Sequence, residues 1–363
     1  MLRAARQLAL LGALATATTA EAGSLRTDTS KSLVPVEEIV PGGPPPDGIP
    51  AIDRPAFVSP AAAAWLSERE PVLALRIGDD ARAYPLQILT WHEIVNDVVG
   101  GVPVAVTFCP LCNSAIVFDR LVDGVILDFG TSGRLYRSDL VMYDRQTHSL
   151  WAQMEGRAIV GARAGERLRL LPANTVAFGE WRAAHPQGRV LSRETGFERR
   201  YGVNPYEHYD EPGLAPFLYR GRLDPRRPPK ERVVGVRLGE AARAYPWSAL
   251  ARQPVVHDRL AGERLVIFYR AGTLSALGHA AMRQARDVGA TGVFSPVVEG
   301  RALTFQAVAH GFRDRETGTT WSLLGHAVRG PLAGRRLRAI PHVDAFWFAW
   351  AAFHPGTSLH DGR

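Results

Sequence analysis

The chain of 363 residues repeats itself once, with motifs returning in the same order at a nearly constant offset. Tyr84-Pro85, for example, returns as Tyr245-Pro246. The paired motifs are residues 81–85 and 242–246, 144–147 and 314–317, 164–169 and 333–338, 185–186 and 354–355, and the tryptophans Trp151 and Trp321, and Trp181 and Trp350. Chance does not produce such a series, so the sequence predicts two tandem homologous units related by a pseudo-two-fold duplication.

The repeat divides the chain into five segments. Hydrophobic residues make up 46% of the sequence, which suffices for the cores of two units. The connector between the units is rich in tyrosine and phenylalanine, so we expect it to pack between them. The predicted segments are a signal peptide (1–22), a Pro/Gly-rich arm (23–67), a first unit (68–195), an aromatic-rich connector (196–228) and a second unit (229–363).

Short apolar runs separated by turn residues dominate the first unit and predict strands. Residues 72–77 and 81–84 flank a Gly-Asp-Asp turn and indicate a hairpin. Pro85 opens a predicted helix that extends to Val95, because Leu86, Leu89, Ile94 and Val95 suit one buried face. Strands are then expected at 102–108, 115–118 and 125–129. The predicted fold class is β-rich α+β with short helices.

The N-terminus has the pattern of a secretory signal peptide. Arg3 and Arg6 precede an apolar stretch from 8 to 20, and residues 20–22 fit the small-x-small cleavage rule. The stretch is too short to span a membrane. We therefore expect cleavage near Ala22 and a periplasmic or secreted protein without a transmembrane segment. A signal retained as an anchor is the alternative.

The formal net charge of +7 comes from scattered arginines. Scattered charge is typical of a solvated surface, whereas nucleic-acid binding requires a basic stripe with stacking aromatic residues. We therefore expect no nucleic-acid partner. The expected partner is a protein or small-molecule redox partner whose identity the sequence does not give.

The only two cysteines, Cys109 and Cys112, follow a predicted buried strand with C-x-x-C spacing. This spacing lets two thiols close a disulfide or bind one metal ion. At the offset of the tyrosine motif, the second unit replaces four residues of this region. They are Cys109, Cys112, His92 and Glu93, which face Arg270, Thr273, Gln253 and Pro254. Because these residues occur in one unit only, they are functional candidates.

Dithiol chemistry is the first hypothesis for this region. One thiolate would attack a disulfide or a peroxide, and the second cysteine would resolve the intermediate. His92 could supply a positive charge or act as a base, with Glu93 beside it in sequence. The protein would then be a thiol-dependent oxidoreductase.

Metal binding is the second hypothesis, because a C-P-x-C turn between strands resembles a metal-binding knuckle. His92 would be the third ligand, and Met142, His148 or Glu93 the fourth. Two sulfurs with histidine and methionine suit copper, and zinc is the other candidate. Such a protein could support metal-assisted redox chemistry or bind the metal without turnover. An interaction scaffold with an inert cysteine pair is the third alternative.

Three motifs resemble the bacterial family DUF3179. They are residues 91–97, 101–112 and 142–147, and the similarity extends to 201–206. The resemblance implies an exported or membrane-associated protein without an assigned reaction. Some members of the family are named as selenoproteins, which favours redox chemistry at the cysteine motif. Asn113 stands where the family often has glycine, and both residues tolerate a left-handed turn.

Overall fold

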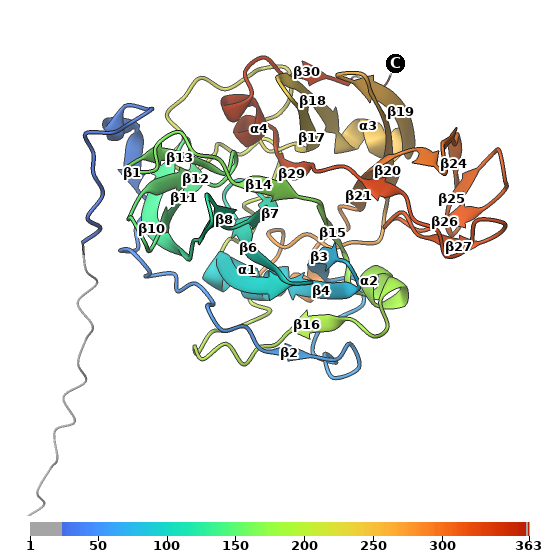
Figure 1. The fold of residues 1–363 in the computed structure, drawn as a ribbon, viewed down its shortest axis with the longest axis horizontal. Coiled ribbons are helices and arrows are strands. Elements are labelled where there is room, and N and C mark those ends of the chain that lie inside the picture. The colour runs from blue at the N-terminus through green and yellow to red at the C-terminus, as the bar shows by residue number, and fades with distance from the viewer. Residues whose placement is uncertain (1–23, 361, 363) are drawn as a thin grey trace, which may run out of the picture.

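The computed structural model describes residues 24–360 and 362, and it is β-rich with a few short helices (Figure 1). This confirms the predicted β-rich α+β class. The predicted signal peptide lies outside the described residues. We call residues 24–228 the N-terminal half and residues 229–360 the C-terminal half. No helix in the described part of the chain combines the length and the apolar character needed to cross a membrane.

Three main sheets form the N-terminal half. In strand order, the first contains β1 (Ile39–Pro41), β10 (Phe129–Tyr136), β11 (Asp139–Asp144), β12 (Leu150–Ala152) and β13 (Arg157–Val160). The second contains β14 (Arg169–Leu171), β7 (Ser114–Asp119), β6 (Val102–Cys109) and β5 (Ile94–Val99). The third contains β15 (Ala173–Ala177), β3 (Pro71–Ile77), β4 (Asp80–Pro85), β16 (Arg189–Leu191) and β2 (Phe57–Val58). A small ribbon pairs β8 (Leu121–Val122) with β9 (Val125–Ile126).

The C-terminal half has sheets of corresponding strand order. One contains β29 (Val343–Phe346), β17 (Arg232–Leu238), β18 (Ala241–Pro246) and β30 (Ser358–Leu359). The next contains β19 (Val255–Leu260), β20 (Glu263–Arg270), β21 (Ala290–Ser295) and β28 (Arg338–Ala339). The last contains β24 (Phe305–Val308), β25 (Gly311–Asp314), β26 (Thr320–Trp321) and β27 (Ala327–Arg329), beside a ribbon of β22 (Val297–Val298) and β23 (Arg301–Ala302).

The helices are short, and each α-helix directly follows a strand. They are α1 (Leu86–His92), α2 (Phe178–Ala184), α3 (Trp247–Arg252), α4 (Trp347–Phe353) and the 3-10 turns η1 (Val36–Glu38) and η2 (Met282–Gln284). The predicted extension of the first helix to Val95 is wrong. Glu93 leaves the helical conformation with φ 57°, and the β-branched residues that follow pair with β6. Their strand tendency and the available partner strand override the helical spacing.

Two hydrogen-bond clusters occur once in each half. The first is the ion pair of Arg82 with Asp97, which also accepts a bond from the hydroxyl of Tyr84. Arg243, Asp258 and Tyr245 form the same set in the C-terminal half. In the second cluster, Asp144 accepts bonds from Thr147 and Trp151, and Asp314 accepts them from Thr317 and Trp321. These shared features therefore stabilise turns and sheets in both halves.

The two halves share a hydrophobic core. A single cluster of buried side chains includes Phe108 and Trp151 from the N-terminal half and Phe346 and Trp350 from the C-terminal half. Strand β7 contacts β29, and β15 contacts β21 (Figure 1). The arm adds β1 and β2 to sheets of the N-terminal half, and the tyrosines of the connector pack against the shared core. The cysteine region therefore lies close to both halves.

Candidate functional site

The cysteines lie on the tight turn between β6 and β7, as the sequence predicts. Cys109 is the last residue of β6 and is paired in register with Ser114. The backbone N–H of Asn113 donates to the carbonyl of Pro110 at 3.3 Å, and Asn113 has φ 52°. Both cysteines are reduced and buried. The turn thus places two thiols on one side of the hairpin end.

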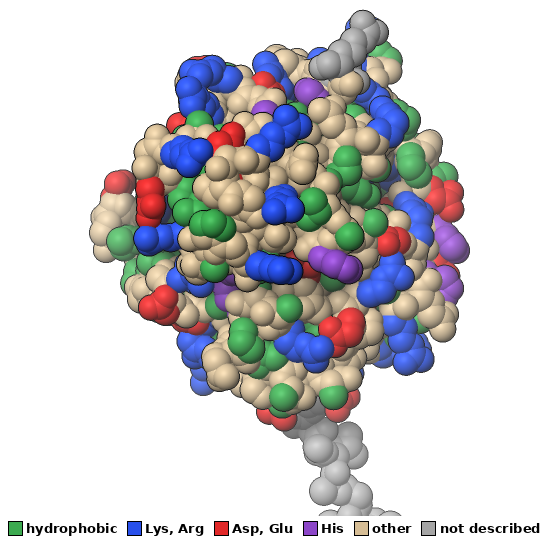
Figure 2. Space-filling model, turned by 90° about the vertical axis from the view of Figure 1, so that its right-hand side faces the viewer, with side chains coloured by type: hydrophobic (Ala, Val, Ile, Leu, Met, Phe, Trp, Pro, Cys, Tyr) green, Lys and Arg blue, Asp and Glu red, His purple; other side chains and the backbone are tan. Residues whose placement is uncertain are grey.

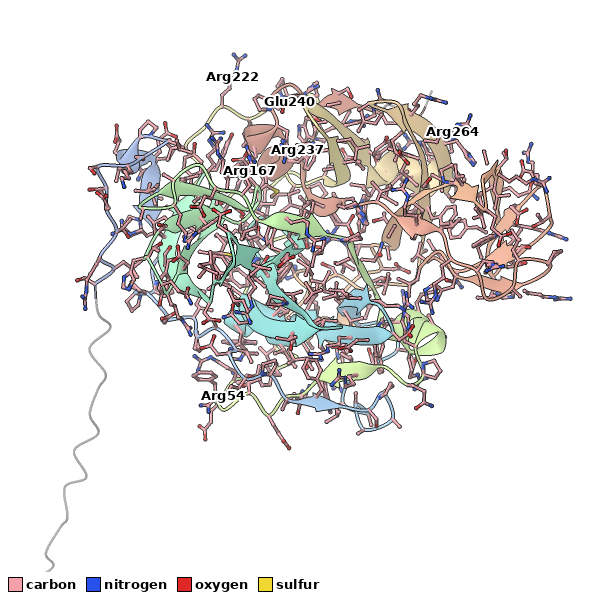
Figure 3. All side chains as sticks on the ribbon, viewed as in Figure 1. Arg54, Arg167, Arg222, Arg237, Glu240 and Arg264 are labelled. Atoms are coloured by element: carbon pink, nitrogen blue, oxygen red, sulfur yellow. The ribbon has the colours of Figure 1, made fainter. Side chains whose placement is uncertain are left out.

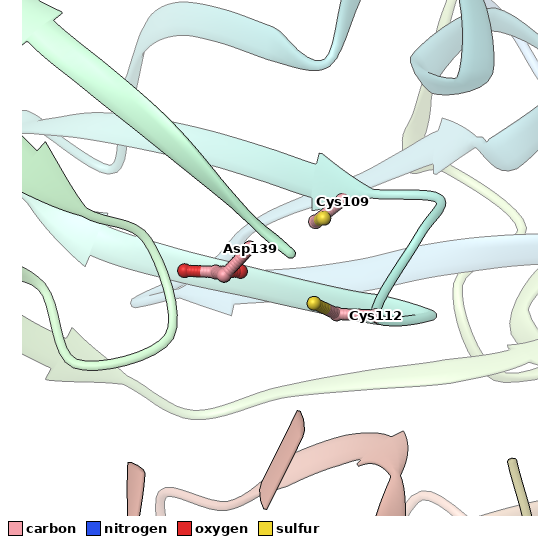
Figure 4. Close-up of side chains that lie close together, drawn as sticks. All are labelled: Cys109, Cys112 and Asp139. Atoms are coloured by element: carbon pink, nitrogen blue, oxygen red, sulfur yellow. The ribbon is translucent and has the colours of Figure 1, made fainter. Parts of the chain in front are cut away.

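Asp139 joins the two cysteines, although the sequence hypotheses did not include it. The Sγ atoms of Cys109 and Cys112 and one carboxylate oxygen of Asp139 all lie within 4.8 Å of one another (Figure 4). The β10–β11 turn delivers Asp139, because Arg137 and Ser138 have φ 54° and 67° and reverse the chain over two residues. Three potential metal ligands therefore come from two separate hairpin turns.

The carboxylate of Asp139 is only half satisfied. Its Oδ2 accepts a hydrogen bond from the backbone N–H of Met154 at 2.8 Å. Its Oδ1 is buried and has no hydrogen-bond partner in the described structure. A buried carboxylate oxygen without a partner is costly, because it has lost its hydration without compensation. A cation bound at Oδ1 would therefore compensate for the lost hydration of this carboxylate.

Burial dominates the electrostatics of the cluster. It raises the pKa of Asp139 to about 7, against the opposing effect of the neighbouring Cys112 thiol. It also raises the pKa of both thiols, Cys112 more strongly than Cys109, and the neighbouring Asp139 carboxylate adds to both shifts. The thiol of Cys112 lies 3.5 Å from the carbonyl of Ser138. Without a cation, these thiols are protonated and are poor nucleophiles near neutral pH.

Glu93 lies next to this cluster, whereas its neighbour His92 points elsewhere. Burial and the nearby Asp139 carboxylate raise the pKa of Glu93 to about 8. The backbone N–H of Phe108 donates to the carbonyl of Glu93 at 2.8 Å and ties it to β6. Both ring nitrogens of His92 are engaged, with the carbonyl of Pro50 at 2.8 Å and the hydroxyl of Tyr201 at 2.6 Å. The structure therefore brings Glu93 toward the cysteines and holds His92 away.

Met142 and His148 occupy other surroundings. Met142 is fully buried in β11 and is paired with Trp151. His148 lies in the turn before β12, and its Nδ1 accepts a bond from the backbone N–H of Arg26 at 3.0 Å. Neither residue belongs to the group formed by the two cysteines and Asp139.

The cluster is covered by the connector and by the C-terminal half. The backbone N–H of Phe346, in β29, donates to the carbonyl of Cys112 at 2.8 Å. Burial raises the pKa of Tyr206 and Tyr209, and the cysteines contribute to both shifts. The ammonium group of Lys230 lies 3.3 Å from the centre of the Tyr209 ring. The C-terminal half thus forms part of the wall around the cysteine cluster but contributes none of its three candidate ligands.

The sequence did contain a signal for Asp139. At the offset that aligns Asp144 with Asp314, Asp139 faces Ala309. The C-terminal half therefore has no aspartate at this offset, just as it has no counterpart of the cysteines or Glu93. The signal was weak because a lone aspartate before an apolar strand is common in turns.

Fold and site together define a class: a β-rich α+β protein with a buried cluster of two cysteines and one carboxylate at the junction of two similar halves. The chain belongs to the family described as "Protein of unknown function (DUF3179)", which it matches over residues 46–357. This confirms the resemblance found in the motifs. Comparison with curated proteins and with solved structures gives no match.

Proposed function

We propose that Cys109, Cys112 and Asp139 bind one metal ion in an exported protein. The observation that carries this proposal is the buried Oδ1 of Asp139, which has no hydrogen-bond partner and belongs to a group of atoms within 4.8 Å that includes both sulfurs. A metal ion would compensate the buried carboxylate and would hold the cysteines as thiolates.

Burial favours the metal over dithiol exchange. Exchange requires an accessible thiolate, and catalytic cysteines have a lowered pKa beside a cation or a helix N-terminus. Here the pKa of both thiols is raised by burial and by a carboxylate. Dithiol redox chemistry stays the second candidate because the two reduced sulfurs lie side by side on a short turn.

The donor set favours zinc over copper. Two thiolates and a carboxylate oxygen are common zinc ligands, whereas Cu(I) prefers sulfur and imidazole. Three protein ligands leave a fourth position, which Glu93 or a water molecule would fill. Closure by Glu93 would make the centre structural, and a water molecule would leave it open for chemistry.

Metal analysis of protein exported in its native form tests the proposal. We expect about one zinc ion per chain, lost in Cys109→Ser and Asp139→Asn because each change removes a charged ligand. His148→Gln is the matched control, since His148 lies outside the cluster, and should retain the metal. A metal-free protein whose thiols cycle reversibly with a mild oxidant would instead support the dithiol function.

We also propose that the protein is exported through the signal in residues 1–22. The basic residues, the apolar stretch and the cleavage motif support this proposal. Cell fractionation followed by N-terminal sequencing tests it, with Gly23 expected as the first residue. A product that retains Met1 in the membrane fraction would indicate an anchor.

Duplication is our proposal for the origin of the two halves. The hydrogen-bond sets centred on Asp97 and Asp258, and on Asp144 and Asp314, support it. The corresponding order of strands supports it too. Superposition of the halves in an experimental structure is the measurement. Sheets that fail to superpose with these aspartates in equivalent positions would contradict a common origin.

A further inference from the structure

A cavity of about 280 Å³ lies between the two halves, away from the cysteine residues. The N-terminal half contributes β3, the segment around β15 and the end of α2. The C-terminal half contributes β21, the β26–β27 turn and β28. A volume of this size suits a small ligand.

The charged and titratable lining of this cavity is basic. It consists of Arg76, His185, His326 and Arg336, and no acidic residue lines the cavity. The rings of His185 and His326 lie 5.1 Å apart, centre to centre. In the described part of the chain, the side chains of His185, His326 and Arg336 form no hydrogen bond or ion pair. Arg76 pairs with Asp79 at 3.0 Å, and the Asp79 side chain is fully exposed. An exposed pair of this kind is weak, so the cavity lacks a strong counter-charge.

The pKa values of the two histidines agree with this imbalance. Burial lowers the pKa of His185 to about 4, with further contributions from His326 and Arg76. Burial and Arg76 lower the pKa of His326 to about 4 as well. Both imidazoles are therefore neutral at pH 7 and can each donate one N–H to an acceptor.

Apart from Asn174, whose side chain donates to the carbonyl of Thr291 at 3.2 Å, the rest of the wall is mostly apolar. Trp181 and Phe294 are fully buried aromatic residues, and Leu324 and Leu337 extend the same surface. A ligand matched to this cavity would have an anionic head group and an apolar body.

The opposite junction between the halves offers an internal comparison. By the offsets of the repeated motifs, Arg237 and His354 correspond to Arg76 and His185, and Arg167 corresponds to Arg336. Arg237 and Arg167 both lie close enough to His354 to lower its pKa. Glu155 and Glu240 act on Arg167, so this junction already contains acidic groups. Figure 3 shows Arg167, Arg237 and Glu240 on neighbouring parts of the molecule.

One of the two acids of the opposite junction has no acidic counterpart at the cavity, whereas the other, Glu240, corresponds to Asp79, which pairs with Arg76. By the alignment that pairs Gly156 with Gly325, Leu324 stands where the other junction has Glu155. The two glycines are structurally equivalent, since a Cβ on either would lie within 2.7 Å of a phenylalanine ring, Phe118 or Phe294. The cavity thus keeps the basic groups and replaces an acid by an apolar side chain.

We propose that this cavity binds a small organic anion, with a carboxylate or phosphate head group on Arg76, Arg336 and the two imidazoles and an apolar body against Trp181 and Phe294. Arginine guanidinium groups bind both head groups through paired hydrogen bonds. The proposal is independent of the metal centre, because no residue of the cysteine cluster lines the cavity.

Calorimetric titration of the mature full chain tests this proposal with phenylacetate, phenyl phosphate and inorganic phosphate as probes. We expect saturable binding of phenylacetate, phenyl phosphate or both, and the preferred probe identifies the head group. Arg336→Gln should weaken binding by about tenfold or more, because a charge-assisted hydrogen bond is lost.

Arg335→Gln is the matched control. Arg335 is the neighbouring residue, it pairs with Glu299 on the surface, and it does not line the cavity. The affinity of the Arg335→Gln variant for the phenyl probes should equal that of the wild type. Three results would overturn the proposal: no saturation with either phenyl compound at millimolar concentration, equal affinity of the Arg336 variant and wild type, or inorganic phosphate binding as tightly as phenyl phosphate. Unchanged thermal unfolding of both variants ensures that the comparison reports binding.

Discussion

Asn113 has a left-handed backbone conformation, with φ 52°, in the turn that carries both cysteines. Glycine adopts this conformation without strain, and asparagine tolerates it better than most residues. Asn113→Ala should therefore lower the free energy of unfolding by about 1 kcal/mol. Asn113→Gly is the control and should change it by less than about 0.5 kcal/mol. Urea unfolding measures both, and equal effects would show that the side chain of Asn113 matters more than its backbone.

The candidate ligands show what a single sequence reveals at the scale of residues. The cysteines stood out because they are unique, and Glu93 because the C-terminal half has Pro254 at the corresponding offset. Asp139 did not stand out, because the turn that aligns it with the sulfurs depends on two residues with positive φ that are not glycine. The bonds of His92 to Pro50 and Tyr201 join segments far apart in the chain, so its orientation was not predictable.

The two ion pairs of the hairpin sheets provide a matched comparison at the scale of elements. Arg82 and Asp97 each expose 7% of the side chain, whereas Arg243 and Asp258 expose 29% and 16%. Removing one partner of a buried pair leaves an uncompensated charge. We therefore expect Asp97→Ala to destabilise the protein by about 3 kcal/mol or more, and Asp258→Ala by about 1 kcal/mol. Chemical unfolding of the two variants checks this order, and a larger loss for Asp258→Ala would contradict it.

Much of the element pattern followed from alternation and turn residues. The hairpin of β3 and β4 and the strand-turn-strand around the cysteines were predicted and are present. The end of α1 was not, because Ile94 and Val95 suit a helix face and a strand equally. Only the pairing of β5 with β6 decides between the two, and that pairing joins separate segments.

At the scale of the whole molecule, each half depends on the other for its core. A fragment of residues 24–228 would lack the Phe346 N–H that binds Cys112 and would expose the ring of Tyr136, against which Phe353 packs. We expect this fragment to show no cooperative thermal unfolding and to bind a hydrophobic dye. Circular dichroism measures the thermal unfolding and fluorescence measures the dye binding, with the full mature chain as the reference. A sharp unfolding transition in the fragment would mean that the N-terminal half folds independently.

The junction between the halves that contains His354 makes the stability of the protein depend on pH. Burial, with Arg237 and Arg167 nearby, lowers the pKa of His354 to about 4. Below pH 6.5 the unfolded chain binds a proton at this residue that the folded protein does not bind. Stability should therefore fall as the pH decreases from 6.5 to 4, with up to about 3 kcal/mol from His354.

Denaturant unfolding at several pH values, repeated with His354→Gln, measures this contribution. The variant should lose less stability than the wild type over the same range. The exposed His208 provides the control, and His208→Gln should follow the wild type. Identical slopes for the His354 variant and the wild type would rule out a buried neutral imidazole.

Basic and acidic side chains are mixed on the surface of the molecule. On the face in Figure 2, Lys and Arg side chains are interspersed with acidic and uncharged ones. The cavity that contains Arg76 and Arg336 differs from this face in that no acidic residue lines it.

Because Phe346 of the C-terminal half contacts Cys112, the reactivity of the cysteines can report local opening between the two halves. Both sulfurs are buried, so a maleimide cannot reach them until β29 or the connector moves away from the β6–β7 turn. When reclosure is fast, the alkylation rate equals the rate of a free thiol multiplied by the population of the open state. The free energy of local opening can thus be obtained from labelling kinetics under native conditions. Bound metal would slow the labelling in proportion to its affinity, so the same two atoms would report both occupancy and motion.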